Sequence, residues 1–179
     1  MKITETKLRG CLILEPTIHK DDRGLFFESY HKSNLESVIG ERINFVQDNI
    51  SVSKKGVLRG LHYQTGKYAQ AKLVQVLKGE VLDVVVDLRR DSNTYGQHFK
   101  LNLSAKNKKS IFIPKDMAHG FLALTDDVIF SYKCDSYYHK EAERGIKYND
   151  PDLNIDWEIE GVDLIFSPKD LQLPPWKDR

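Results

Sequence analysis

The sequence predicts an all-β protein, a sandwich or barrel of short strands for which a jelly roll is a natural candidate. Several segments of strand length are apolar or alternate, with many β-branched and aromatic residues; the clearest are residues 73–77, 81–88, 110–113 and 128–134. Glycines separate such segments through the first two-thirds of the chain, at positions 24, 56, 66, 79 and 96. Many short strands with turn signals between them are typical of sandwiches and barrels.

Turn and helix signals are local and short. Lys78-Gly79 lies between two apolar runs and predicts a tight hairpin. Ser33 and Glu36 have the spacing of a capping box, and Gly40 is a suitable stop, so we expect one small helix there.

The C-terminal third has a different character from the rest of the chain. Its prolines, at positions 151, 168, 174 and 175, predict loops and short turns, with Trp157 and Trp176 as anchors. No linker, repeat or low-complexity stretch interrupts the sequence, so we expect one domain over residues 1–179.

Composition excludes several classes of protein. With 27 basic and 26 acidic residues the net charge is +1, which gives no long-range attraction for nucleic acid or an anionic membrane. The N-terminus lacks the apolar run of a signal peptide, and no later run is long enough to span a bilayer. We expect Cys11 and Cys134 to be buried thiols of a cytoplasmic protein.

Two histidine segments suggest a metal site at first sight. A glycine-led segment containing His62, and a later one in which Pro114 precedes His119, resemble the two half-motifs of the cupin superfamily. Metal-binding cupins carry His-x-His followed closely by Glu, whereas this chain has Gln64 and then Lys72. Two histidines without a carboxylate, beside a lysine, are a poor ligand set for zinc or iron, so we expect no metal.

His62 alone does not reveal a function. Strict alternation places Leu58, Gly60, His62 and Gln64 on one face of the strand, and Arg59, Leu61 and Tyr63 on the other. A single histidine among apolar strand residues is usually a structural, hydrogen-bonded side chain.

A longer series of motifs extends over almost the whole chain. In these motifs the sequence is similar to the dTDP-4-dehydrorhamnose 3,5-epimerase family: Gln47-Asp48-Asn49-x-Ser51, Leu58-Arg59-Gly60-Leu61-His62-Tyr63-Gln64, Gln70-x-Lys72-Leu73-Val74, Gly79-Glu80-Val81-x-Asp83-Val84, Val86-Asp87-Leu88-Arg89, Ile113-Pro114-x-x-x-Ala118-His119-Gly120-Phe121, Tyr132-Lys133-Cys134, Glu143-Arg144-Gly145-Ile146, Asn149-Asp150-Pro151 and Lys169-Asp170. The resemblance implies a cupin-type jelly roll with a few short, mostly C-terminal helices. It also implies a homodimer that uses no metal or cofactor.

The reaction that the resemblance implies inverts carbons 3 and 5 of dTDP-4-dehydro-6-deoxy-D-glucose, on the route to dTDP-L-rhamnose and its lipopolysaccharide or cell-wall polysaccharides. Such an isomerase needs a base, a group that stabilises the enolate, and an acid on the opposite face. The resemblance gives these roles to His62, Lys72 and Tyr132, with Asp170 holding the imidazole. Without it, Asp170 reads as a helix cap, Lys72 as a solvated lysine and Tyr132 as an inward-facing core residue in phase with Phe130.

Further positions match ligand contacts of the family. Arg23 and Arg59 match the diphosphate region, although strict alternation turns Arg59 away from His62 unless the strand bulges after Gly60 or Arg59 reaches a neighbouring subunit's ligand. Tyr138 matches the residue that stacks on thymine. His119 matches a residue near the sugar, with a structural histidine as the alternative. The remaining matches are nucleotide-side positions that could lie across a dimer interface, Phe26, Glu28, Gln47 and Asn49, and two further ligand contacts, Glu143 and Lys169.

Three other functions remain open at this point. A relative that inverts one carbon only, or acts on another 4-keto sugar nucleotide, would share the same four catalytic positions. A non-catalytic cupin-like binding module would have no use for Tyr132 as an acid. A metal-dependent cupin oxygenase is disfavoured by Gln64 and Lys72.

Overall fold

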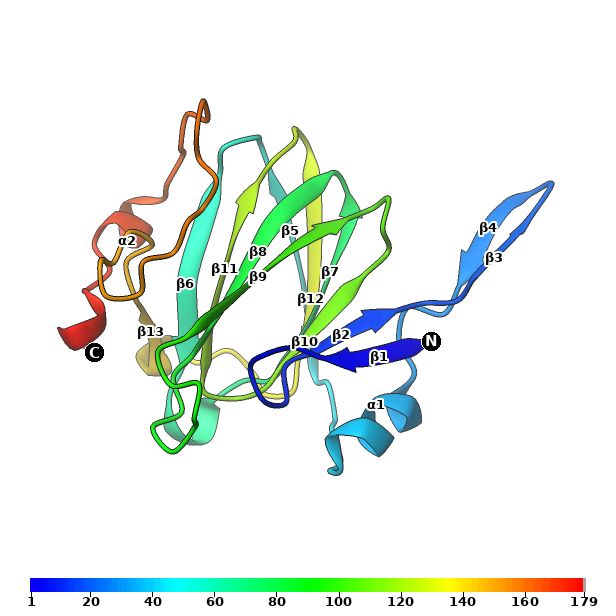
Figure 1. The fold of residues 1–179 in the computed structure, drawn as a ribbon, viewed down its shortest axis with the longest axis horizontal. Coiled ribbons are helices and arrows are strands. Elements are labelled where there is room, and N and C mark those ends of the chain that lie inside the picture. The colour runs from blue at the N-terminus through cyan, green and yellow to red at the C-terminus, as the bar shows by residue number, and fades with distance from the viewer. Residues whose placement is uncertain (179) are drawn as a thin grey trace.

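Two antiparallel sheets face each other in the computed structural model, which describes residues 1–178 (Figure 1). The first sheet has six strands in the order β1 (Lys2–Glu5), β2 (Leu12–Glu15), β10 (Ser110–Ile113), β7 (Lys72–Lys78), β12 (Val128–Cys134) and β5 (Gln47–Ser53). The second has five, in the order β13 (Glu143–Gly145), β6 (Leu58–Gln64), β11 (Met117–Ala123), β8 (Glu80–Asp87) and β9 (His98–Ser104). The predicted all-β jelly-roll architecture is therefore confirmed.

Helical elements are few and short. They are α1 (Lys32–Ile39), α2 (Pro168–Leu171) and the 3₁₀ turns η1 (Gly66–Tyr68), η2 (Lys140–Ala142) and η3 (Trp176–Asp178). The predicted stop of the first helix is confirmed, because Gly40 adopts the left-handed conformation and donates its N–H to the Glu36 carbonyl. The predicted capping box is wrong: His31 is the N-cap residue, and the Ser33 hydroxyl bonds the His31 ring instead.

Three apolar clusters hold the layers together. The central cluster lies between the sheets and includes Val74, Val85 and Phe130. A second covers the outer face of the five-stranded sheet, where the C-terminal segment packs through Trp157, as predicted for an anchor. The third joins α1 to the outer face of the six-stranded sheet. Within residues 1–178, no helix is long and apolar enough to cross a membrane.

The Lys78-Gly79 turn joins the two sheets and is not a hairpin. β7 pairs with β10 and β12, whereas β8 pairs with β9 and β11. The chain therefore changes sheets at Gly79, whose φ of 79° suits a tight corner. A short polar turn between two apolar runs gives the same pattern for both geometries, so the pattern could not separate them.

A bulge in β6 changes which residues face the interior. His62 pairs with His119, and Arg59 pairs with Phe121. Between these two pairs β6 advances three residues and β11 only two, so β6 contains one extra residue. Gly60 and Gly120 allow this, because a Cβ on Gly60 would lie 2.5 Å from the Gly120 Cα. The alternation predicted for this strand is wrong beyond the bulge.

Leu58 belongs to the outer cluster with Leu61 instead of sharing a face with His62. Arg59 turns inward, and its Nε donates to the Ser53 hydroxyl on β5 at 3.3 Å. The bulge after Gly60 is thus the correct one of the two explanations considered for Arg59.

A two-stranded hairpin, β3 (Ile18–Asp21) and β4 (Gly24–Phe27), projects away from the sandwich (Figure 1). All four residues of β3 and most of β4 are exposed, and Phe26 is 72% exposed. An isolated two-stranded hairpin is only marginally stable in water, and this one makes little contact with the sandwich.

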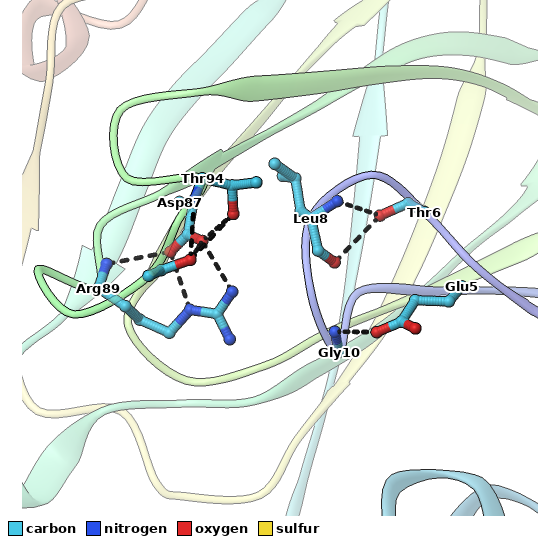
Figure 2. Close-up of polar contacts among 8 residues, drawn as sticks. Glu5, Thr6, Leu8, Gly10, Asp87, Arg89 and Thr94 are labelled. Atoms are coloured by element: carbon cyan, nitrogen blue, oxygen red, sulfur yellow. Dashed lines mark hydrogen bonds and ion pairs between the residues drawn. The ribbon is translucent and has the colours of Figure 1, made fainter.

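Asp87 anchors the loop that follows β8. Figure 2 shows its carboxylate accepting from the guanidinium of Arg89 at 2.7 and 2.8 Å and from the hydroxyl of Thr94 at 2.6 Å, beside the loop between β1 and β2. Ser92 donates a further bond at 2.6 Å. Burial would raise the pKa of Asp87, but these hydrogen bonds outweigh it and hold the pKa well below its usual range.

We expect Asp87→Asn to destabilise the protein by roughly 2–3 kcal/mol, because the amide cannot accept all these bonds and leaves Arg89 without its partner. Because the native pKa is lowered, the stabilisation is complete above the pKa of an unfolded aspartate, about 4, and is lost as the pH falls towards the native pKa. Urea unfolding at several pH values should therefore show a wild-type advantage that shrinks below about pH 4. The exposed Asp91→Asn is the control, and an equal loss in both variants would contradict this role.

Candidate active site

Several of the polar side chains named by the sequence come from strands of the two facing sheets. β6 and β11 contribute from one sheet, and β5, β7 and β12 from the other. The cluster lies inside a structure whose core is otherwise apolar, so each buried polar group in it needs a partner.

His62 and Asp170 form the closest contact of the cluster. The His62 Nε2 lies 2.6 Å from the Asp170 Oδ1, although the two residues are 108 positions apart. The aspartate side chain is 6% exposed and the histidine side chain 28% exposed. With Nε2 engaged by a carboxylate, Nδ1 is the imidazole nitrogen left to exchange a proton.

Asp170 is held by the first turn of α2. Ser167 caps this helix by accepting from the Asp170 N–H at 3.1 Å, and its hydroxyl donates to Asp170 Oδ2 at 2.7 Å. Pro168 occupies the first turn, where its missing N–H costs nothing. Hydrogen bonds from His62 and Ser167 outweigh the effect of burial and lower the pKa of Asp170. The carboxyl is therefore ionised at neutral pH. Its reading as a helix cap is wrong because Ser167 is the cap.

Lys72 and Tyr132 lie together on neighbouring strands. The Lys72 Nζ lies 5.9 Å from the centre of the Tyr132 ring. Lys72 makes no ion pair with any other of residues 1–178, and burial lowers its pKa. Burial raises the pKa of Tyr132, so the phenol keeps its proton at neutral pH. The tyrosine packs inward against Phe130, as alternation predicts.

A second histidine–aspartate pair lies next to the first. His119 is the cross-strand neighbour of His62, and its Nε2 lies 2.8 Å from Asp83 Oδ2. The Asp83 side chain is completely buried, and its Oδ1 has no partner among residues 1–178. Asp83 was not among the predicted site residues. The signal was present, however, since it is a charged residue at an inward position of an apolar strand.

A group of polar side chains around Glu143 extends towards the surface. The Tyr138 hydroxyl donates to Glu143 Oε2 at 2.7 Å, and Lys169 pairs with the same oxygen at 2.5 Å. Despite its burial, Glu143 has a lowered pKa because Lys169 and Tyr138 bond it, with a smaller effect from His62. Gln47 accepts from the Tyr138 N–H at 2.8 Å and donates to Asn49 at 2.9 Å. These five predicted residues therefore form one connected group.

Three predicted site residues lie elsewhere within one chain. Arg23, Phe26 and Glu28 belong to the projecting hairpin and its exit. The Arg23 side chain is 90% exposed and pairs with its neighbour Asp21 at 2.5 Å. A single chain does not bring these three to the cluster around His62.

No metal centre is evident in the described part of the chain. Among residues 1–178, no three His, Cys, Asp or Glu side chains are grouped so that they could hold a metal ion. Gln64 occupies the position of a metal ligand in metal-binding cupins, but its side-chain amide forms hydrogen bonds with backbone groups of Tyr68, Tyr137 and His139. The two cysteines are free and buried, as predicted.

The cluster offers the parts of a proton-transfer site. The imidazole of His62 is supported by a carboxylate, and Lys72, which has no ion pair among residues 1–178, lies beside the protonated phenol of Tyr132. Glu143 is within electrostatic reach of all three side chains, and such groups can together move a proton beside a carbonyl. The nearby thiol of Cys134 is a poor nucleophile, because burial raises its pKa to about 11.

Comparison with known proteins identifies the family. The family model for dTDP-4-dehydrorhamnose 3,5-epimerase matches residues 5–178. A curated enzyme of that description from Methanothermobacter thermautotrophicus is 47% identical, covering 99% of this chain and 95% of the relative. The crystal structure of such an epimerase from Elizabethkingia anophelis superposes with a TM-score of 0.96 at 51% identity, covering 100% of this chain and 98% of the other.

A second solved structure carries a ligand. It is a dTDP-6-deoxy-D-glucose-3,5-epimerase from Legionella pneumophila in complex with dTDP-4-keto-L-rhamnose, with a TM-score of 0.91 at 46% identity, covering 97% of this chain and 92% of the other. The match in sequence and in fold extends over the whole sandwich and the C-terminal segment that carries Asp170. This chain therefore belongs to the dTDP-4-dehydrorhamnose 3,5-epimerase family of isomerases.

Proposed function

We propose that the chain converts dTDP-4-dehydro-6-deoxy-D-glucose to dTDP-4-dehydro-L-rhamnose, with the His62–Asp170 pair as the base for carbons 3 and 5. The 2.6 Å contact between these side chains carries the proposal, because a buried carboxylate at Nε2 leaves Nδ1 as the acceptor for the substrate proton. The carboxylate also stabilises the imidazolium that forms when the proton arrives.

Lys72 stabilises the enolate that proton removal creates. Both inverted carbons flank the 4-keto group, so a single cation beside that oxygen serves both steps. Because Lys72 has no ion-pair partner among residues 1–178, its charge is available to the developing oxyanion. Asp83 and Glu143 lie close enough to support its protonated form, which opposes the effect of burial.

Tyr132 returns a proton to the opposite face of the sugar. It reaches the cluster from β12 in the six-stranded sheet, whereas His62 reaches it from β6 in the other sheet. Its raised pKa keeps it a donor at neutral pH. A binding module would need no such donor, which favours catalysis.

The nucleotide end lies towards Tyr138. Its ring is 52% exposed beside Glu143 and Lys169, and so offers a stacking face for thymine. The inward guanidinium of Arg59 suits the diphosphate, with Gln47 and Asn49 on the facing strand and His119 near the sugar.

We propose a homodimer in which the hairpin of one chain completes the site of its partner. Arg23, Phe26 and Glu28 lie on exposed surface where they have no function within one chain. The outer face of the six-stranded sheet also carries two exposed apolar residues: Ile50 is 66% exposed and Val52 is 65% exposed. A two-fold dimer would bury this face and bring the hairpin to a nucleotide.

Residues 1–179 act as one catalytic domain in this proposal, without a metal or cofactor. The free thiols of Cys11 and Cys134 support a reducing cytoplasmic setting. The net charge of +1 supports a protein without a nucleic-acid or membrane partner.

Asp170→Asn should lower kcat by roughly 10²–10⁴-fold with little change in KM, because it removes the charge that supports the imidazolium. Steady-state turnover of dTDP-4-dehydro-6-deoxy-D-glucose is the measurement. Asp163→Asn, in the same C-terminal segment but exposed, is the matched control and should be unchanged. A loss confined to KM, or no loss, would remove the dyad from the mechanism.

Tyr132→Phe should separate exchange from inversion. In deuterium oxide, His62 can still remove and return protons on one face, so label enters the sugar while the inverted product forms roughly 100-fold more slowly. Proton NMR follows both processes in the same sample. Equal slowing of exchange and inversion would show that Tyr132 only supports the fold.

Subunit mixing tests the shared site. Chains with Arg23→Ala and Phe26→Ala should complement chains with His62→Asn, because half of the mixed dimers' sites then have every wild-type group. After random exchange, about a quarter of all sites should be active. A mixture no more active than the mean of its two parents would place the hairpin outside the site.

A further inference from the structure

Three glutamines hold the segment that presents Tyr138. Residues 135–139 follow β12, and we name this segment the tyrosine loop. It exposes Tyr137 by 70% and Tyr138 by 52%, so the rings themselves contribute little packing that could fix it. Its geometry has to come from hydrogen bonds to its backbone.

Gln64 makes two of these hydrogen bonds and a third to η1. Its Nε2 donates to the Tyr68 carbonyl at 2.9 Å and to the Tyr137 carbonyl at 3.4 Å, and its Oε1 accepts from the His139 N–H at 2.6 Å. The side chain is 4% exposed, and both of its N–H groups and its oxygen are used. A buried amide with this pattern joins η1 and the tyrosine loop to the strand that carries His62.

Two more glutamines hold the loop on either side. The Gln70 Nε2 donates to the Ser136 carbonyl at 2.7 Å, and the Gln47 Oε1 accepts from the Tyr138 N–H at 2.8 Å. Four consecutive residues, 136–139, therefore each bond a glutamine amide through the backbone. The His139 ring stacks on Tyr68 at 3.9 Å and closes the far end of the loop.

Glutamine suits this task better than the alternatives. The tyrosine loop presents the Tyr137 carbonyl and the His139 N–H to Gln64, and η1 presents the Tyr68 carbonyl; a neutral amide can satisfy both kinds of group. A carboxylate could accept but not donate, and an apolar side chain would leave all three backbone groups buried without partners.

We infer that Gln64 and Gln70 are positioning residues for nucleotide binding, which fix the tyrosine loop so that the Tyr138 ring is in place before the nucleotide arrives. The inference rests on the proposed stacking role of Tyr138. Neither glutamine touches the sugar in this scheme, so their effect appears in affinity and not in the chemical step. Gln64 also connects the loop that presents Tyr138 to β6, because it lies on that strand two residues after His62.

Binding of dTDP by isothermal calorimetry tests the inference. Gln64→Leu and Gln70→Leu, both close in volume to glutamine, should each weaken dTDP binding by about tenfold because the ring must be ordered on binding. At saturating substrate, kcat should stay within about threefold of wild type, a split that general loss of structure would not give. Gln97→Leu, in the exposed loop before β9, is the matched control and should bind normally.

A double-mutant cycle gives the decisive comparison. In the Tyr138→Ala background, Gln64→Leu should cost little further affinity, because the platform that it positions is gone. Full additivity would overturn the inference, as would normal dTDP binding by both single glutamine variants while Tyr138→Ala binds weakly. Normal binding by Tyr138→Ala would instead refute the proposed role of Tyr138 itself. If Gln64→Leu does not fold, Gln70→Leu, whose glutamine is only half-buried, carries the same cycle.

Discussion

The contact between His62 and Asp170 is the interaction on which the rest of the site depends. It links a central strand to a four-residue helix near the C-terminus, across 108 positions of sequence. Ser167 fixes one end of the pair by capping α2, and the bulge at Gly60 fixes the other by setting the phase of β6. Trp157 packs the C-terminal segment against Leu58 and Leu61 of β6, and this packing helps to hold Asp170 beside His62.

The cluster also concentrates charge where a fold would otherwise place apolar residues. Asp83 is wholly buried with one oxygen unbonded among residues 1–178, and Lys72 lies near it without an ion pair. Such groups lower stability unless a ligand completes them. Asp87 shows the contrast, because its buried carboxylate is fully bonded and serves only the fold. Buried charged groups with unsatisfied hydrogen bonds or no ion pair therefore distinguish the proposed active site from the rest of the interior.

Regular segments could be predicted from the sequence and irregular ones could not. Alternation placed Tyr132 inward because the register between β12 and β5 is regular along the whole strand, and that between β12 and β7 is interrupted only before Phe130. It failed for Arg59 and Leu58 because one extra residue in β6 reverses the faces, and two glycines were the only local sign. Asp170 and Asp83 depend on contacts between distant segments, so only the family resemblance or the structure could pair them with histidines. The Ser-Pro step before Asp170 did contain a capping signal.

The central claim is that His62 removes the protons from carbons 3 and 5. Incubation of dTDP-4-dehydro-6-deoxy-D-glucose in deuterium oxide, followed by proton NMR, measures this removal at each carbon separately. The wild-type protein should introduce deuterium at both carbons, and folded His62→Asn should introduce it at neither. Label at carbon 3 alone would assign a single-site reaction, and normal exchange by His62→Asn would contradict the account.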